Sequence, residues 1–342
     1  MARRPANLVG AFLSAAILAA CGGATSGLSP TSTQNAATSF HFATPAGPTQ
    51  IRIAGDSCCY MAVDPALNHI YVSSGINLSG NHTTVVKGGS SLSILATVNK
   101  FGGANNVDWK THNVWLPGLY GRDVDVYSGR KLSDITTISL SRCPITSWVD
   151  GVRRYGWIAA QCGSDNDPVW AINADTYAVV AGPIGSGGVM GGISVLNPVT
   201  GKYYFNDSAG NFEVNPLASF ALSPTSFGVA LGVNRITDVL YAQATHGLNI
   251  IDGRSEKIEK TVPLSYTPNF MGVNSHLNHI YLSAGQNSIQ VREGTGGKVL
   301  KTLNLTPGIV ILSLGADDVR ARIYIAGTMG GNDYLYEVED RY

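Results

Sequence analysis

A sevenfold internal repeat constrains the fold of this chain more than any other feature of its sequence. Each unit has a short apolar segment, an Asp or Asn that we call the anchor, six further residues, and an aromatic residue that opens a second apolar segment. The spacer length is constant, and successive units begin 37 to 47 residues apart. This period is typical of the four-stranded blades of a β-propeller. The pairs are Asp64 and Tyr71, Asp108 and Trp115, Asp150 and Trp157, Asn197 and Tyr204, Asn234 and Tyr241, Asn274 and Tyr281, and Asp317 and Tyr324.

The residue types within a unit predict two successive hairpins. Asp or Asn favours a turn because its side chain can bond the backbone ahead of it. Alternation such as that in 69–72 predicts the strand after the turn. A second hairpin follows, and segments 248–253 and 257–262 show it best. Each unit therefore supplies four strands, which we call A to D from the axis outward.

The seventh unit lacks its fourth strand. It holds strand-like segments at 309–315, 321–326 and 334–338, and the sequence then ends at Tyr342. We expect the unassigned strand 50–54 to become strand D of blade seven and to close the ring, because an open edge invites pairing with other chains. The prediction is an all-β fold, a single seven-bladed β-propeller of four-stranded antiparallel blades over residues 50–342.

The repeats resemble those of YVTN-type β-propeller proteins. Met61 to Pro65 followed by Asn68 to Val72 carries the resemblance best, and Ile251-Asp252-Gly253 followed by Lys260-Thr261-Val262 matches the second half of that repeat. The resemblance covers residues 50 to 340 and implies the same fold. Only Tyr204-Phe205-Asn206 approaches the Tyr-Val-Thr-Asn sequence for which these repeats are named. Members of the family serve varied roles, so the resemblance implies no particular ligand.

The N-terminal segment resembles a bacterial lipoprotein signal. Arg3 and Arg4 precede the apolar run 8–20, which is too short to span a bilayer. The run ends in Leu18-Ala19-Ala20-Cys21, which matches a lipobox at all four positions. The resemblance implies a signal peptide over residues 1–20 and a Cys21 thiol that is acylated, as with palmitate, and anchors the protein to a membrane. The alternative is an ordinary signal peptide with an incidental cysteine.

Residues 21–49 separate this signal from the repeats. From 22 to 50 there is no Asp, Glu, Lys or Arg, and Ser, Thr, Ala, Gly and Pro dominate, which predicts a flexible tether. By resemblance to enterobacterial lipoproteins, Gly22 in place of Asp favours the outer membrane. In a bacterium without an outer membrane, the location would be the outer leaflet of the cell membrane.

The charge balance argues against a nucleic-acid partner. The chain has 23 Lys and Arg against 23 Asp and Glu, so no basic field attracts nucleic acid. Hydrophobic residues make up 44% of the chain, which is enough for a large core. We therefore expect a folded domain whose partners are the membrane, through its lipid, and an envelope protein or small ligand at the propeller mouth.

Four cysteines follow Cys21, and an exported protein sits where disulfides persist. Cys143 and Cys162 lie about equally far from the turn that joins strands A and B of the third unit, so we expect a disulfide between them. Cys58 and Cys59 would then be reduced or joined as a vicinal pair. Some quinoprotein dehydrogenase propellers place such a pair over their cofactor, but a structural or unpaired role is favoured here.

Ligands of propellers usually bind where the D-to-A loops and inner strands meet the central channel. The positions four to six before each anchor hold no Asp, Glu or His. They lack the oxygen ligands with which gluconolactonase-like propellers hold a divalent ion, and they lack a general acid–base pair. We therefore expect no metal, no cofactor and no catalytic residue there. Tyr60, Asn269 and Phe270 are the candidate ligand contacts.

Other polar residues are explained by repetition and turns. His69, His112, His276 and His279 fall near A-to-B turns on the opposite face, and 165–167 is expected to be a solvated turn. The favoured function is a ligand- or protein-binding scaffold. The alternative is an enzyme of lyase or lactonase type with catalytic groups on longer loops. The available loop residues for that alternative are Arg122, Asp123, His246 and Asp333.

Overall fold

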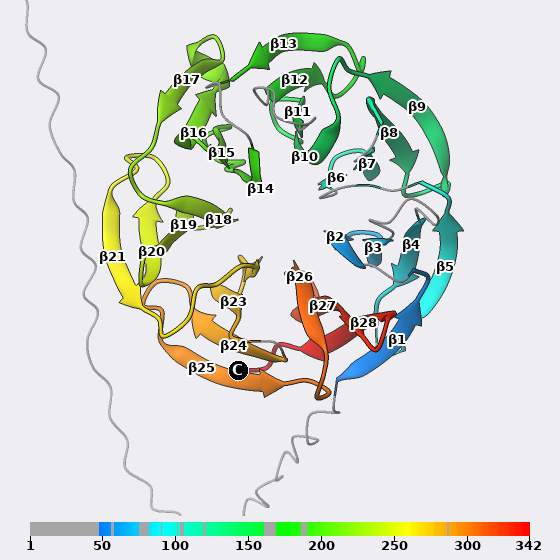
Figure 1. Ribbon diagram of the computed structural model, residues 1–342, viewed down its shortest axis with the longest axis vertical. Helices are drawn as coiled ribbons and strands as arrows, with labels where there is room; N and C mark the ends of the chain where they lie inside the picture. The colour runs from blue at the N-terminus through cyan, green and yellow to red at the C-terminus, as the bar shows by residue number, and fades with distance from the viewer. Residues whose placement is uncertain are drawn as a thin grey trace, which may run out of the picture. The chain divides into compact units, whose positions relative to one another are not determined.

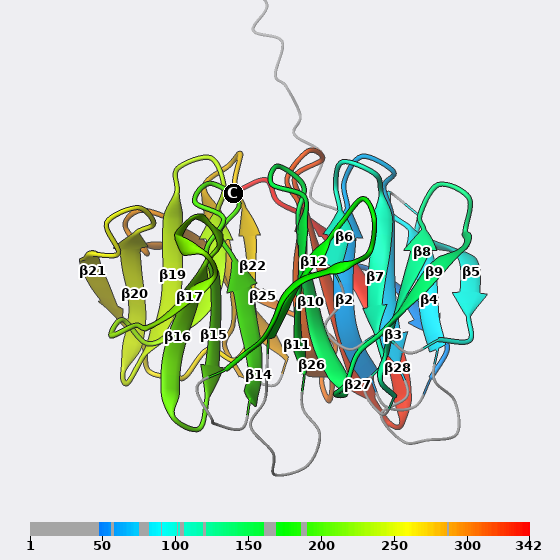
Figure 2. The same cartoon turned by 90° about the horizontal axis from the view of Figure 1, so that it is seen from above.

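The computed structural model describes residues 48–55, 58–74, 82–89, 91–100, 102, 106–118, 121–160, 169–185, 190–285 and 287–342. Over these residues the chain is nearly all β. Seven four-stranded antiparallel sheets stand as blades around a central axis (Figure 1; Figure 2). The exception is a short 3-10 helix, η1 (Pro216–Ala218), and no described helix meets the length and hydropathy needed to cross a membrane. The predicted seven-bladed propeller is confirmed.

The strands follow the predicted order from the axis outward. The A strands are β2 (Cys58–Asp64), β6 (Asn106–Asp108), β10 (Pro144–Asp150), β14 (Met190–Leu196), β18 (Val229–Asn234), β22 (Met271–Asn274) and β26 (Val310–Asp317). The B strands are β3 (His69–Ser74), β7 (Asn113–Pro117), β11 (Tyr155–Ala160), β15 (Tyr203–Asp207), β19 (Val239–Ala244), β23 (His279–Ser283) and β27 (Arg322–Met329). The C strands are β4 (His82–Lys87), β8 (Asp123–Ser128), β12 (Val169–Asn173), β16 (Gly210–Asn215), β20 (Gly247–Asp252), β24 (Ser288–Glu293) and β28 (Asn332–Glu339). The D strands are β5 (Ser93–Val98), β9 (Ser133–Ser139), β13 (Val179–Ile184), β17 (Ala221–Pro224), β21 (Ile258–Pro263), β25 (Val299–Asn304) and β1 (Thr49–Ile53).

Blade seven joins the two ends of the described chain. β1 pairs antiparallel with β28, with Thr49 opposite Glu337 and Ile53 opposite Asp333. The Ile53 side chain is buried in a cluster that holds residues of blades seven and one. The predicted closure by an N-terminal strand is therefore confirmed.

The anchors form the same turn in every blade. Each anchor lies at the end of strand A or directly after it, and its side-chain oxygen accepts hydrogen bonds from backbone N–H groups two or three residues ahead. For Asp150 the distances are 2.8 Å to the nitrogen of Val152 and 2.9 Å to that of Arg153. The residue four places after each anchor has a φ between 52° and 80°, which turns the chain back into strand B.

The aromatic partners explain why the blades assemble into a ring. Each is at most 1% exposed, and each lies in a different hydrophobic cluster. Every one of these clusters combines side chains of that blade and the next. Trp157, for example, stacks on Tyr203 of blade four with ring centroids 5.4 Å apart. A repeat can therefore bury its aromatic residue only against a neighbour, and seven such interfaces form the core.

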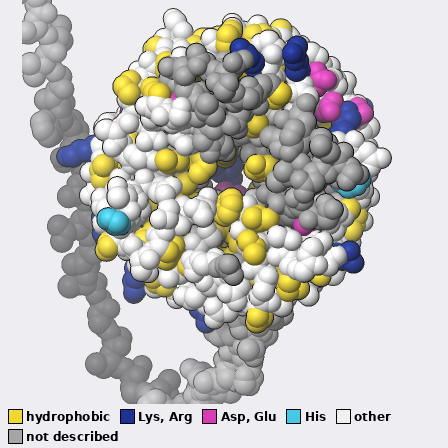
Figure 3. Space-filling model, in the orientation of Figure 1, with side chains coloured by type: hydrophobic (Ala, Val, Ile, Leu, Met, Phe, Trp, Pro, Cys, Tyr) yellow, Lys and Arg dark blue, Asp and Glu magenta, His cyan; other side chains and the backbone are white. Residues whose placement is uncertain are grey.

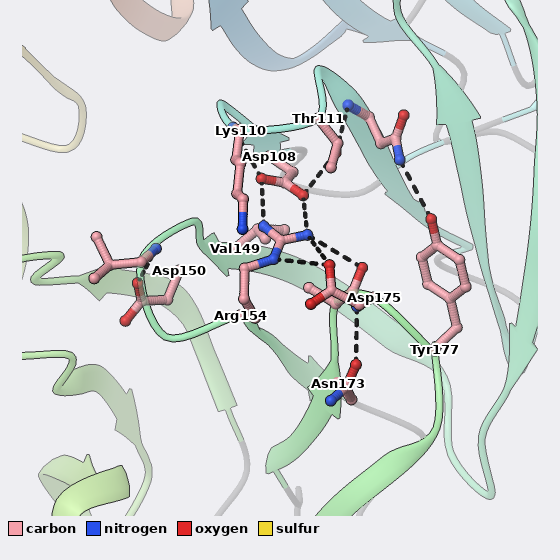
Figure 4. Close-up of polar contacts among 12 residues, drawn as sticks. Asp108, Lys110, Thr111, Val149, Asp150, Arg154, Asn173, Asp175 and Tyr177 are labelled. Atoms are coloured by element: carbon pink, nitrogen blue, oxygen red, sulfur yellow. Dashed lines mark hydrogen bonds and ion pairs between the residues drawn. The ribbon is translucent and has the colours of Figure 1, made fainter.

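Polar contacts reinforce the same interfaces at the A-to-B turns. Arg154, four places after the third anchor, binds the second anchor, Asp108, and also Asp175 (Figure 4). Similar contacts join other neighbouring blades. They are His112 with Asp64 at 2.8 Å, Asn197 with Asp238 at 2.8 Å, and Asn234 with Asn278 at 2.9 Å. Each anchor thus shapes its own turn, and several also tie that turn to the next blade.

Candidate functional site: the central channel

The inner strands enclose a cavity along the propeller axis. Its volume is about 430 Å³, and residues of all seven blades line it. Figure 3 shows it as a hollow at the centre of the ring, with hydrophobic side chains around it. Most of the wall is apolar. The apolar lining includes Met61, Val63, Ile193, Leu231, Val233, Met271, Val273, Leu312 and Leu314.

Close contact between inner strands depends on glycine. A Cβ atom on Gly232 would lie 2.9 Å from both the Met271 sulfur and Cγ2 of Val273 in the next blade. A Cβ atom on Gly315 would lie 2.8 Å from Cγ2 of Val63. Both distances are too short for carbon, so these glycines let the strands of neighbouring blades approach.

The three residues predicted as ligand contacts all line the cavity. Tyr60 belongs to β2, and Asn269 and Phe270 directly precede β22. They lie several residues before their anchors, at the end where the D-to-A loops enter the inner strands. Asn269 is exposed, and the other two are partly buried. The structure therefore brings these residues to one mouth of the channel.

Blade three supplies an indole to the wall. Trp157 and Trp170 of this blade are buried in the packing between blades. Trp148 lines the cavity, and its Nε1 donates a hydrogen bond of 3.2 Å to the Ser194 hydroxyl. An indole and a hydroxyl thus lie together in a wall that is mainly apolar.

The second mouth, formed by the A-to-B turns, carries charge. Arg235 directly follows the anchor of blade five, and Asp318 directly follows the anchor of blade seven. Nε and Nη2 of Arg235 lie 3.1 Å and 2.8 Å from Oδ2 of Asp318, so the pair spans blade six. In blade six the Ser275 hydroxyl accepts the backbone N–H of Arg235 at 3.2 Å.

Sequence reasoning missed this mouth because it considered only positions before the anchors. The position directly after each anchor lines the channel in six blades. Those six residues are Pro65, Trp109, Pro198, Arg235, Ser275 and Asp318. The sequence does contain a signal for this mouth. When the residue directly after the anchor is compared across the seven repeats, two of the residues at that position, Arg235 and Asp318, carry opposite charges.

Exposed apolar side chains surround the charged mouth. They stand one to three places after the anchors, in the same turns. The larger ones are Trp109, Val152, Ile236, Leu277 and Val319. The rim of this mouth therefore combines exposed apolar side chains with polar and charged ones such as Arg235.

The four histidines near the A-to-B turns do not converge. His112 and His276 lie in turns, whereas His69 and His279 open strands β3 and β23. The Nδ1 atoms of His112 and His279 lie 2.8 Å and 2.9 Å from carboxylate oxygens of Asp64 and Asp340. Burial lowers the pKa of His69. Within the described part of the chain, no three or more His, Cys, Asp or Glu residues form a group that could hold a metal ion.

The loop residues of the enzyme alternative are also dispersed. Arg122 and Asp123 belong to blade two, His246 to blade five and Asp333 to blade seven. None of the four is part of the described cavity wall. Asp123 accepts a hydrogen bond of 2.7 Å from the Ser139 hydroxyl on the adjacent outer strand.

Cys143 is disulfide-bonded. Cys162 and the side chains of Cys58 and Cys59 are outside the described part of the structure, so the Cys143–Cys162 pairing stays a prediction. The register of β10 and β11 places Pro144, next to Cys143, opposite Ala160. Cys21, the signal segment, the tether as far as residue 47, and 165–167 also lie outside the described residues, whereas Thr49, the last residue of the predicted tether, belongs to β1.

Comparison of the sequence with known protein families and with curated proteins finds no match.

Proposed function

We propose that this protein is an envelope-anchored lipoprotein with YVTN-type repeats, and that its propeller is a binding scaffold with the central channel as its ligand site. The observation that carries this proposal is the apolar cavity of about 430 Å³. Small-molecule sites are typically concave, mainly apolar and of this size, with a few polar groups that orient the ligand. The described wall combines such a surface with Tyr60, Trp148, Ser194 and Asn269.

The anchoring half of the proposal rests on the sequence of the N-terminal segment. In it, residues 1–20 are the signal peptide, Cys21 carries the lipid, and the residues from there to the start of β1 at Thr49 form the tether. The location is the outer membrane in a bacterium that has one, and otherwise the outer leaflet of the cell membrane. A scaffold held there by a tether meets small apolar molecules or envelope proteins, and the cavity favours the former.

A titration with the neutral dye N-phenyl-1-naphthylamine tests the channel. We expect saturable binding with one dye per protein, together with a change in tryptophan emission, because Trp109 and Trp148 line the cavity.

Two substitutions on β26 form a matched pair for this test. Leu312 lines the cavity, whereas Val310 is exposed and is not part of the wall. Leu312→Asp should weaken dye binding at least tenfold because it puts a charge in an apolar wall, and Val310→Asp should leave binding unchanged. Failure of the wild type to bind, or equal effects of the two substitutions, would overturn the proposal.

A further inference from the structure

We infer that the channel accepts an amphipathic carboxylate, with its anionic group at Arg235 and its apolar body along the cavity. This inference rests on the proposed function and names the ligand class for the same site. It starts from the difference between the two mouths. Among the described lining residues, the charged ones are Arg235 and Asp318, and both lie at the mouth formed by the A-to-B turns. The other mouth offers neutral groups such as Tyr60 and Asn269.

The geometry of the pair leaves the cation available and hides the anion. Nε and Nη2 of Arg235 both point to one oxygen of Asp318. The Asp318 side chain is only 8% exposed, whereas that of Arg235 is 41% exposed. Nη1 of Arg235 therefore keeps its donors for a ligand, and guanidinium binds carboxylates well because its donors form a planar fork.

Further polar groups lie near the pair at this mouth. Nδ1 of His276 lies 3.7 Å from the same Asp318 oxygen, and the His276 side chain is about half exposed. Lys110, next to Trp109, is exposed in the turn of blade two. The anchor carboxylates of these turns are buried and accept hydrogen bonds from the backbone. Asp318 thus acts as a positioning residue that holds Arg235 at the mouth.

The apolar wall requires the rest of the ligand to be apolar. An inorganic anion would gain the contact with Arg235 but bury nothing against Leu231, Val233 or Met271, which line the same cavity. A neutral hydrocarbon would fill the cavity but leave the guanidinium without an anion. A molecule with both parts has one favoured orientation, with its head at the charged mouth.

Competition against the bound naphthylamine dye tests the inference. Decanoate, decanol and decylammonium share one chain and differ in their head group, and each is used at concentrations where it does not form micelles. We expect decanoate to displace the dye at about tenfold lower concentration than decanol, equivalent to about 1.4 kcal/mol, with decylammonium the weakest. Added salt should weaken decanoate and leave decanol unchanged.

Substitutions of Arg235 test whether this residue causes the preference for decanoate. Arg235→Met keeps the length of the apolar stem and removes the charge, so it should cancel the advantage of decanoate while decanol binding reports an intact channel. Arg235→Lys should restore part of that advantage. Arg254→Met is the matched control, because Arg254 also pairs with an aspartate, Asp238, in the same blade but does not line the cavity.

The outcomes separate this inference from the function on which it rests. If the dye binds but decanoate is no better than decanol, or Arg235→Met behaves like Arg254→Met, the inference is wrong and the apolar site stands. Preference for decylammonium would also overturn it and would assign the head-group site to Asp318. If the dye does not bind at all, the proposed function itself fails.

Discussion

Arg154 of blade three lies 2.9 Å from Asp108, the anchor of blade two, and both side chains are largely buried at the boundary between the two blades. Burial by itself would raise the pKa of Asp108, but hydrogen bonds from Arg154 and Thr111 hold it below its usual value. The same carboxylate accepts the backbone N–H of Lys110. One residue thus shapes a turn and joins two blades.

Removal of this arginine should destabilise the ring. Arg154→Met leaves the buried charge of Asp108 without its cation, and a loss of about 3 kcal/mol in the free energy of unfolding is expected. Asp175→Asn is the control, since Asp175 contacts the same arginine from an exposed position and should matter little. Urea denaturation compares the two variants with wild type. Equal losses of unfolding free energy in the two variants would show that the buried contact with Asp108 stabilises the fold no more than the exposed contact with Asp175 does.

A carboxylate pair between blades four and five predicts a pH dependence. Lys202 Nζ lies 2.8 Å from Glu213 and 2.5 Å from Glu256. Burial, and next the hydrogen bond with Glu256, raise the pKa of Glu213 from 4.5 to about 7. The folded state therefore keeps a proton that the unfolded state releases, so this contribution to stability is present below about pH 4.5 and is lost as pH rises through about 7.

Substitution of Glu213 tests this sign. Glu213→Gln mimics the protonated form, so it should match wild type near pH 4.5 and be more stable by about 2 kcal/mol at pH 8. Glu256→Gln should instead destabilise at pH 8, because Glu256 accepts hydrogen bonds from Lys202 and from the Tyr204 hydroxyl. Urea denaturation at the two pH values measures both effects. A Glu213→Gln variant that is less stable at pH 8 would contradict the assignment.

The fold could be predicted from the sequence because its determinants are local and repeated. The anchor turn involves only the four residues that follow the anchor, and each aromatic partner comes at a fixed distance after it. The same pattern therefore occurs seven times in the sequence, and each copy is independent evidence for the fold. The charged mouth could not be predicted in this way. Arg235 and Asp318 are 83 residues apart, and only the packing of blades five, six and seven around the axis brings them to the same opening.

The repeat pattern predicts where a residue lies along a strand but not where its side chain points. Tyr60, Asn269 and Phe270 could be placed at one mouth from their distance to the anchors alone. The direction of the Trp148 side chain could not, because it depends on the bulge between Pro144 and Thr146 and on the neighbouring Ser194. Position along a strand is thus readable from the sequence, whereas side-chain direction depends on packing.

Removal of β1 should destabilise the whole propeller. A chain that begins at Ala54 lacks the strand that pairs with β28 and loses the buried Ile53. A chain that begins at Pro48 retains both and serves as the control. We expect a clear fall in melting temperature for the first chain relative to the second. Equal melting temperatures would mean that the ring is stable with its last blade open.

The cysteine pairing has a direct chemical test. Digestion without reductant should yield a peptide with Cys143 joined to one with Cys162, detected by mass spectrometry. Cys143→Ala should then cost about 3 kcal/mol of stability, because the bridge closes a short loop. A link from Cys143 to Cys58 or Cys59 would instead connect blade three to blade one.

Lipid attachment at Cys21 predicts the form of the mature N-terminus. Mass spectrometry of protein purified from membranes should show an acylated Cys21 as the first residue. Cys21→Ser should release a soluble or unprocessed form, which fractionation detects. A mature chain that begins elsewhere with a free amine would rule out the anchor.

The pairing of β1 with β28 also dictates when the ring can be completed. Thr49 pairs with Glu337, so β1, the first strand of the described part of the chain, has to wait for β28, its last strand. During that interval its edge is open to other chains. Its sequence alternates Ile51 and Ile53 with the exposed residues Gln50 and Arg52, and a charge on an edge strand discourages such pairing. The strand that completes the ring thus carries its own protection against aggregation while synthesis is under way.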